Sequence, residues 1–159
     1  MPQSPASFAL AAWSARSSSP FPTARELQRR SAVERPALDG ARILIVEDDF
    51  LILIELESVL RDAGAHIAGA CRKVDEAVAL AREQEIDAAL LDLRVGHDAI
   101  TPVARCLDHR GVPFAFYTGQ TETDPIRAEW PDCAIVAKPA VPHLIVAAVA
   151  ALLQRPRRG

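Results

Sequence analysis

The chain has 159 residues, half of them hydrophobic, which is enough for one domain of about 100–150 residues with a tail. Three cysteines without a Cys-x-x-Cys pair argue against a disulfide framework or a zinc site and favour a reducing, cytoplasmic location. The net charge of −3 combines basic ends with an acidic body, which disfavours DNA binding, and no apolar run reaches the ~20 residues of a membrane span.

The N-terminal segment, residues 1–40, is rich in Ser, Pro, Ala and Arg and has no clean structural period apart from one short helical stretch at 23–35. We expect a disordered extension there, either a leader or the product of a start codon assigned too far upstream. Residues 41–153 are predicted to form the folded domain. Residues 154–159 are predicted to be a basic, solubilising tail.

Apolar runs alternate with segments of helical spacing from residue 41 onward. Short apolar runs typical of strands covered on both faces lie at 43–46, 66–70, 88–93, 114–117 and 134–137. Helices are predicted at 50–63, 75–83, 101–108, 124–129 and 141–153. In the second helix, Asp75 is the predicted N-cap, and Val78 and Leu80 are predicted to face the core. This alternation predicts an α/β fold with a doubly wound, five-stranded parallel sheet.

Polar residues lie at the carboxyl ends of four of the five predicted strands, at the sheet edge where ligands bind in such folds. They are Glu47-Asp48-Asp49, Asp92, Thr118 and Lys138. Crowded carboxylates repel one another and need a cation, and oxygen ligands of this kind suit Mg²⁺. A carboxylate beside such a metal can accept a phosphoryl group as an acyl phosphate, while Lys138 and the Thr118 hydroxyl can contact other phosphoryl oxygens.

Four motifs, ILIVEDD, LLDLRVG, YTG and AKPA, occur in order at these strand ends. Together they resemble the motifs of bacterial two-component response-regulator receiver domains, over about residues 41–153. The resemblance implies a flavodoxin-like (βα)5 fold. It also implies Asp92 as the phosphoacceptor, at a spacing from Asp48 that is typical of receivers.

The same resemblance implies roles for the remaining site residues. The metal ligands would be Asp48, Asp92 and the backbone carbonyl of Arg94, with Glu47 acting through water. Asp49 would be a variable acid outside this set. The conserved hydroxyl falls on Thr118 and the conserved lysine on Lys138, and the proline after that lysine implies a cis peptide bond.

Several positions depart from the family pattern. The position three before the lysine, which is aromatic in the family, is occupied by Ile135. The sequence therefore lacks an aromatic side chain for coupling at that position, and Tyr117 is the candidate substitute. Ala140 replaces a common phenylalanine, and the loop after Asp92 lacks a proline found in many receivers. In receivers, the positions of Arg94 and Gln120 flank the phosphoryl group, so the resemblance implies that both residues influence its lifetime.

The implied function is that of a stand-alone receiver in a phosphorelay rather than an enzyme. A sensor histidine kinase or a histidine phosphotransfer protein would donate the phosphoryl group. Output would pass through contacts with an unknown downstream protein, with a weak homodimer as an option and without DNA or membrane binding.

Two other functions are alternatives to the receiver. A haloacid-dehalogenase-like phosphohydrolase would have a second acid where Asp92-Leu93-Arg94 has an arginine, and would have a cap domain. A degenerate receiver that serves only as a binding module would lack the acceptor, a metal acid or the lysine. All three of these are present in the sequence.

Overall fold

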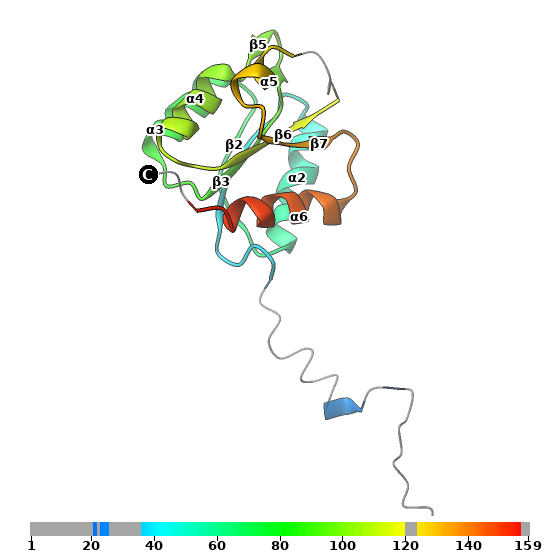
Figure 1. Ribbon diagram of the computed structural model, residues 1–159. Helices are drawn as coiled ribbons and strands as arrows, with labels where there is room; N and C mark the ends of the chain where they lie inside the picture. Colours follow the sequence, from blue (N-terminus) through cyan, green and yellow to red (C-terminus); the bar gives the residue numbers. More distant parts are fainter. Residues whose placement is uncertain (1–20, 22, 26–35, 120–123, 157–159) are drawn as a thin grey trace, which may run out of the picture. The chain divides into compact units, whose positions relative to one another are not determined.

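A computed structural model of the chain describes residues 21, 23–25, 36–119 and 124–156 (Figure 1). Its contacts divide the chain into two units, Met1–Glu34 and Arg35–Gly159. In the first unit, residues 24–25 are helical. Most of the segment predicted to be disordered and most of the predicted helix at 23–35 lie outside the described residues, and there both stay predictions. No described helix combines the length and apolar character needed to cross a bilayer.

The second unit is built on a five-stranded sheet in which every neighbouring pair of strands is parallel. The strand order is β2-β1-β3-β6-β7. The strands are β1 (Arg42–Val46), β2 (His66–Cys71), β3 (Ala88–Leu91), β6 (Phe114–Thr118) and β7 (Ala134–Ala137). This is the flavodoxin-like order. The predicted doubly wound α/β fold is therefore confirmed.

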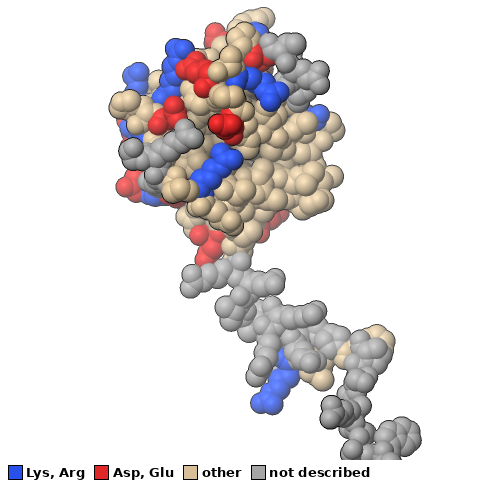
Figure 2. Space-filling view, in the orientation of Figure 1, with Lys and Arg blue, Asp and Glu red and all other residues tan. Residues whose placement is uncertain are grey.

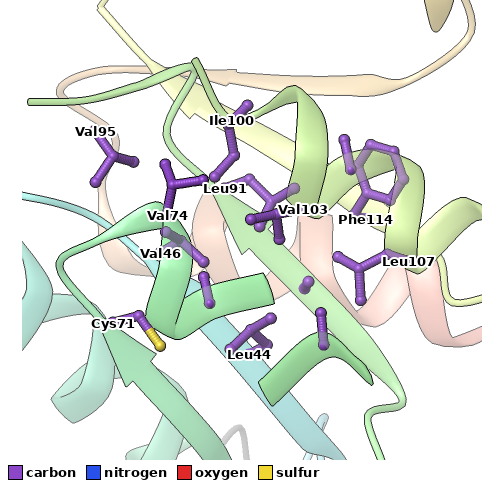
Figure 3. Packing of buried hydrophobic residues seen from close by; sticks show 14 of the residues in the cluster. Leu44, Val46, Cys71, Val74, Leu91, Val95, Ile100, Val103, Leu107 and Phe114 are labelled. Atoms are coloured by element: carbon purple, nitrogen blue, oxygen red, sulfur yellow. The ribbon is translucent and has the colours of Figure 1, made fainter. Parts of the chain in front are cut away.

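Helices cover both faces of this sheet (Figure 1). On one face lie α2 (Phe50–Asp62) and α6 (Pro142–Leu153). On the other lie α3 (Val74–Glu83), α4 (Thr101–His109) and α5 (Ile126–Glu129). Figure 3 shows the core on the α3, α4 and α5 face, where Val74, Val103 and Leu107 pack on Leu44 and Leu91 of the central strands. The continuous apolar runs of β1, β3 and β6 are explained by this double coverage.

The start of α3 differs from the prediction. The helix begins at Val74, and the N-cap position belongs to Lys73, which makes no side-chain capping bond. Asp75 lies in the first turn, so its assignment as N-cap is wrong. Val78 and Leu80 pack against the core but are only partly buried. The buried positions of the helix follow the helical period from its first residue: Val74, Ala77 and Ala81.

A two-stranded hairpin that the sequence did not predict follows β3. Its antiparallel strands are β4 (Arg94–Val95) and β5 (Asp98–Ala99). Gly96 in the turn has a φ of 65°, a conformation that favours glycine. The hairpin places the loop after Asp92 in a defined conformation.

Contacts of the domain begin before the predicted boundary at residue 41. Leu38 is buried in the core of the α2 and α6 face, and its N–H donates to the carbonyl of Ala63 at 2.9 Å. The side chain of Pro36 lies against Gly64, at the end of α2. The segment before β1 is therefore held by the turn that follows α2.

We expect Gly64→Ala to lower the free energy of unfolding more than Gly40→Ala does. Both glycines have positive φ values, 93° and 69°, so alanine adds backbone strain of about 1–2 kcal/mol at each. At Gly64 the new Cβ would also lie 2.5 Å from Cβ of Pro36, whereas at Gly40 it meets nothing within 4 Å. Such overpacking costs roughly a further 1–3 kcal/mol. Urea unfolding of both variants checks this, and equal losses would contradict the clash with Pro36.

Candidate functional site

The pairing of β1 with β3 brings two of the predicted acids together. Val46 pairs with Leu91, and the N–H of Asp92 donates to the carbonyl of Val46 at 2.9 Å. Glu47 and Asp92 therefore leave neighbouring strands at the same edge of the sheet. Carboxylate oxygens of Glu47, Asp48 and Asp92 all lie within 4.8 Å of one another.

Lys138 reaches this acidic cluster from β7. Thr118 pairs with Ala137, and the backbone N–H of Lys138 donates to the carbonyl of Thr118 at 2.9 Å. The Nζ atom of Lys138 lies 2.5 Å from Oε2 of Glu47 and 2.9 Å from Oδ2 of Asp92. The Lys138–Pro139 peptide bond is cis, as the resemblance implied. One cation thus bridges two of the three carboxylates.

Burial dominates the electrostatics of Glu47, whose exposed fraction is 1%. Burial raises the pKa of Glu47, and hydrogen bonds from Lys138 and from the N–H of Asp49 oppose that change. Burial alone would lower the pKa of Lys138. Its hydrogen bonds to Glu47 and Asp92, with the charges of both, outweigh burial and leave that pKa raised. The lysine is therefore held in its charged form between two anions.

Asp48 is positioned by two residues that the sequence did not single out. Its Oδ2 accepts the N–H of Gly96 at 2.9 Å, which ties the β4–β5 hairpin to the acidic cluster. Its backbone carbonyl accepts Nε–H of Arg72 at 3.0 Å. A glycine within the Val-Gly-His sequence was a signal for the turn at Gly96. No sequence pattern pointed to Arg72, because its role depends on the spatial proximity of β2 to β1.

Asp49 caps α2. Its Oδ1 accepts the N–H groups of Leu51 and Ile52 at 2.9 and 3.2 Å. These contacts satisfy backbone donors that no helical carbonyl can reach. Capping of α2 therefore explains the presence of Asp49, the third acid of the ILIVEDD motif, without a role in metal binding.

The two residues considered for coupling through an aromatic side chain, Ile135 and Tyr117, lie on opposite faces of the sheet. Thr118 is buried at the end of β6. Ile135 packs in the α3, α4 and α5 core, whereas Tyr117 lies in the α2 and α6 core with Nζ of Lys138 5.2 Å from its ring centroid. Tyr117 pairs with Val136, the residue after Ile135, and therefore faces the opposite side of the sheet from Ile135. Its role as a substitute for the aromatic side chain stays a prediction. Gln120 lies outside the described residues.

The donor set of the cluster fits a divalent cation. Three carboxylates within 4.8 Å supply the oxygen ligands that Mg²⁺ prefers. Both oxygens of Glu47 already have hydrogen-bond partners, in line with a role through water. The predicted ligation by the backbone carbonyl of Arg94 stays a prediction, as do the individual ligand roles.

No protein-family model matches the chain, and no curated protein does. Solved structures do match. SdrG from Sphingomonas melonis Fr1 is 36% identical with a TM-score of 0.62, over 72% of this chain and 97% of that one. A response regulator receiver protein from Sinorhizobium medicae WSM419 is 26% identical with a TM-score of 0.62, over 73% and 96%.

A longer protein matches over part of its length. The anti-anti-sigma factor PhyR from Bartonella quintana is 22% identical with a TM-score of 0.62, over 81% of this chain. The present chain spans 55% of that protein, about half of its length. The fold, the acidic cluster at the strand ends and these likenesses define a receiver-type signalling domain. The chain belongs to the response-regulator receiver family.

Proposed function

We propose that the chain accepts a phosphoryl group on Asp92 from a phosphohistidine donor in a phosphorelay. One observation carries the proposal: Nζ of Lys138 lies 2.9 Å from Asp92 and 2.5 Å from the buried Glu47, at the edge where three carboxylates converge. A lysine so placed can transfer one of its hydrogen bonds to an incoming phosphoryl oxygen. A carboxylate at the same edge provides the nucleophile.

The proposed reaction is a single phosphoryl transfer. A carboxylate oxygen of Asp92 attacks phosphorus, the P–N bond to the donor histidine breaks, and the histidine nitrogen leaves with the bond electrons. Lys138 and the Thr118 hydroxyl bind phosphoryl oxygens of the acyl phosphate. Asp48, Asp92 and the carbonyl of Arg94 would hold Mg²⁺, with Glu47 acting through water. Bound Mg²⁺ would neutralise charge on the transferring group.

An apolar surface beside the acidic cluster supports a protein donor. Phe50, Leu51 and Ile54 of α2 have exposed fractions of 55%, 76% and 47%, and Val141 and Leu144 at the start of α6 are also about half exposed. Figure 2 shows a broad face of the domain without charged side chains. Exposed apolar patches of this kind mark partner sites. We assign this one to a sensor histidine kinase or a histidine phosphotransfer protein.

Signalling would proceed by contact with a downstream protein, not with DNA, and a weak homodimer is compatible with this output. The described cysteines Cys71, Cys106 and Cys133 are free thiols, which suits a reducing cytoplasm. The chain would act as a phosphoacceptor and not as a multiple-turnover enzyme.

Phosphorylation by a small donor tests the proposal. The full chain is incubated with Mg²⁺ and acetyl phosphate, and its intact mass is measured. We expect a gain of one phosphoryl group that is lost in Asp92→Asn, is prevented by EDTA and persists in Asp98→Asn, a matched control on the neighbouring hairpin. The absence of any gain, with acetyl phosphate and with a kinase-driven donor, would contradict the proposal. Multiple turnovers of a phosphate ester would favour a phosphohydrolase.

A further inference from the structure

Arg94 lies between two anionic side chains from different parts of the chain. Its backbone nitrogen is 3.5 Å from Oδ1 of Asp92, the proposed phosphoacceptor. Its Nε atom is 3.8 Å from Oδ2 of Asp124, which precedes α5. The Arg94 side chain is 56% exposed, so its guanidinium has solvent around it in which to turn. The Asp124 side chain is only 15% exposed.

Asp124 is held in place independently of Arg94. Its Oδ1 accepts the N–H of Ile126 at 3.1 Å, and Ile126 is buried in the core on the α3 and α4 side. At the other end of α5, Glu129 forms a two-point ion pair with Arg105 of α4, at 2.7 and 2.9 Å. Asp124 is therefore a fixed anion, and Arg94 is the side chain of the pair that is free to move.

We propose that Arg94 exchanges Asp124 for the phosphoryl group when Asp92 is phosphorylated, and that Asp124 sets the lifetime of the phosphorylated state by competing for Arg94. This inference rests on the function proposed above. A phosphoryl group carries a charge of roughly −2 and several strong acceptor oxygens, whereas Asp124 carries a single charge. Guanidinium groups bind phosphate oxygens through two parallel hydrogen bonds, so the exchange is favourable.

The exchange has a consequence for hydrolysis. Loss of the phosphoryl group requires a water oxygen to attack phosphorus, with the Asp92 carboxylate as the leaving group and inorganic phosphate as the product. A guanidinium bound over the phosphoryl oxygens hinders the approach of that water. Asp124 draws Arg94 away from this position and thereby shortens the lifetime.

The exchange also transmits phosphorylation to α5. When Arg94 leaves, Asp124 loses its cation while it still accepts the N–H of Ile126. The charge balance at the start of α5 changes, although no aromatic side chain is present at Ile135. This connection runs over the surface and does not require repacking of the core.

Lifetimes of four variants test the inference. The full chain is phosphorylated with acetyl phosphate and Mg²⁺, the donor is removed by desalting, and decay is followed by intact mass. We expect Asp124→Asn to lengthen the lifetime by about two- to fivefold, the scale of an exposed ion pair. Arg94→Ala should shorten it, and the double variant should behave as Arg94→Ala alone. Asp124→Glu should restore a lifetime close to that of the unmodified chain.

Glu129→Gln is the matched control, because it breaks an ion pair of α5 that does not include Arg94. It should leave the lifetime unchanged. A second measurement follows the backbone amide of Ile126 by NMR, whose resonance should shift on phosphorylation in the unmodified chain and not in Arg94→Ala.

The outcomes separate the inference from the function on which it rests. An unchanged lifetime in Asp124→Asn, or additive effects in the double variant, would overturn the exchange while leaving phosphorylation of Asp92 intact. Failure of the unmodified chain to gain a phosphoryl group would overturn both.

Discussion

Phosphorylation of Lys138→Met by acetyl phosphate is expected to be at least about 100-fold slower than that of the unmodified chain. Lys138 provides the positive charge 2.9 Å from Asp92, and the loss of one preorganised electrostatic contact typically costs about 10²–10³-fold in rate. The initial rate of phosphoryl gain by intact mass checks this. A loss of less than about tenfold would show that the lysine is not a major contributor to the transfer.

The same substitution should destabilise the fold. It leaves Glu47, which is 1% exposed, without its counter-charge, and removing one partner of a buried ion pair costs roughly 3–5 kcal/mol. Because burial already raises the pKa of Glu47, the variant should regain stability at lower pH, where Glu47 takes up a proton. Its deficit should therefore be larger at pH 8 than at pH 5 in urea unfolding.

A double variant tests whether Lys138→Met loses phosphorylation through unfolding. Adding Glu47→Gln to Lys138→Met removes the unpaired carboxylate with little change in shape. We expect this addition to restore much of the stability and none of the phosphorylation rate. Recovery of phosphorylation along with stability would mean that the single variant failed through unfolding and not through lost chemistry.

The sheet was predictable because its signal is local and strong. The central strands are short apolar runs covered on both faces, and they occur at the predicted places, with ends within a few residues. The errors arise where side chains with no periodic pattern decide the boundary. Asp75 was a reasonable N-cap by residue type, but Val74 is buried against the sheet and starts the helix one residue earlier. Leu38 was missed because a single buried leucine has no period.

The acidic cluster was predictable for a different reason. In a parallel sheet the carboxyl ends of the strands converge, so the strand order together with the terminal residues locates Glu47, Asp92 and Lys138 near one another. Contacts that depend on loop conformation could not be predicted from the strand order and the terminal residues. The bond from Gly96 to Asp48 requires the unpredicted hairpin, and the pair between Arg94 and Asp124 joins two loops whose relative position no spacing rule specifies.

Phe116→Ala is expected to lower the free energy of unfolding by about 3–5 kcal/mol. Phe116 has an exposed fraction of 0% in β6, and its ring meets that of Phe114 edge-on at 5.6 Å between centroids. Truncation removes the favourable free energy of burying the aromatic ring. It also leaves a cavity, because β6 is paired with strands on both sides and the sheet cannot collapse to fill the space.

Phe50→Ala makes the same chemical change at a surface position and serves as the control. Phe50 is 55% exposed, and its described ring contact is with the guanidinium of Arg72, whose carbon lies 5.6 Å from the ring centroid. Exposed contacts of this kind contribute about 0.5–1 kcal/mol, so the loss should stay below about 1 kcal/mol. Urea unfolding of both variants measures the difference. Similar losses would place Phe50 within the packed core and would remove the apolar donor surface proposed for α2.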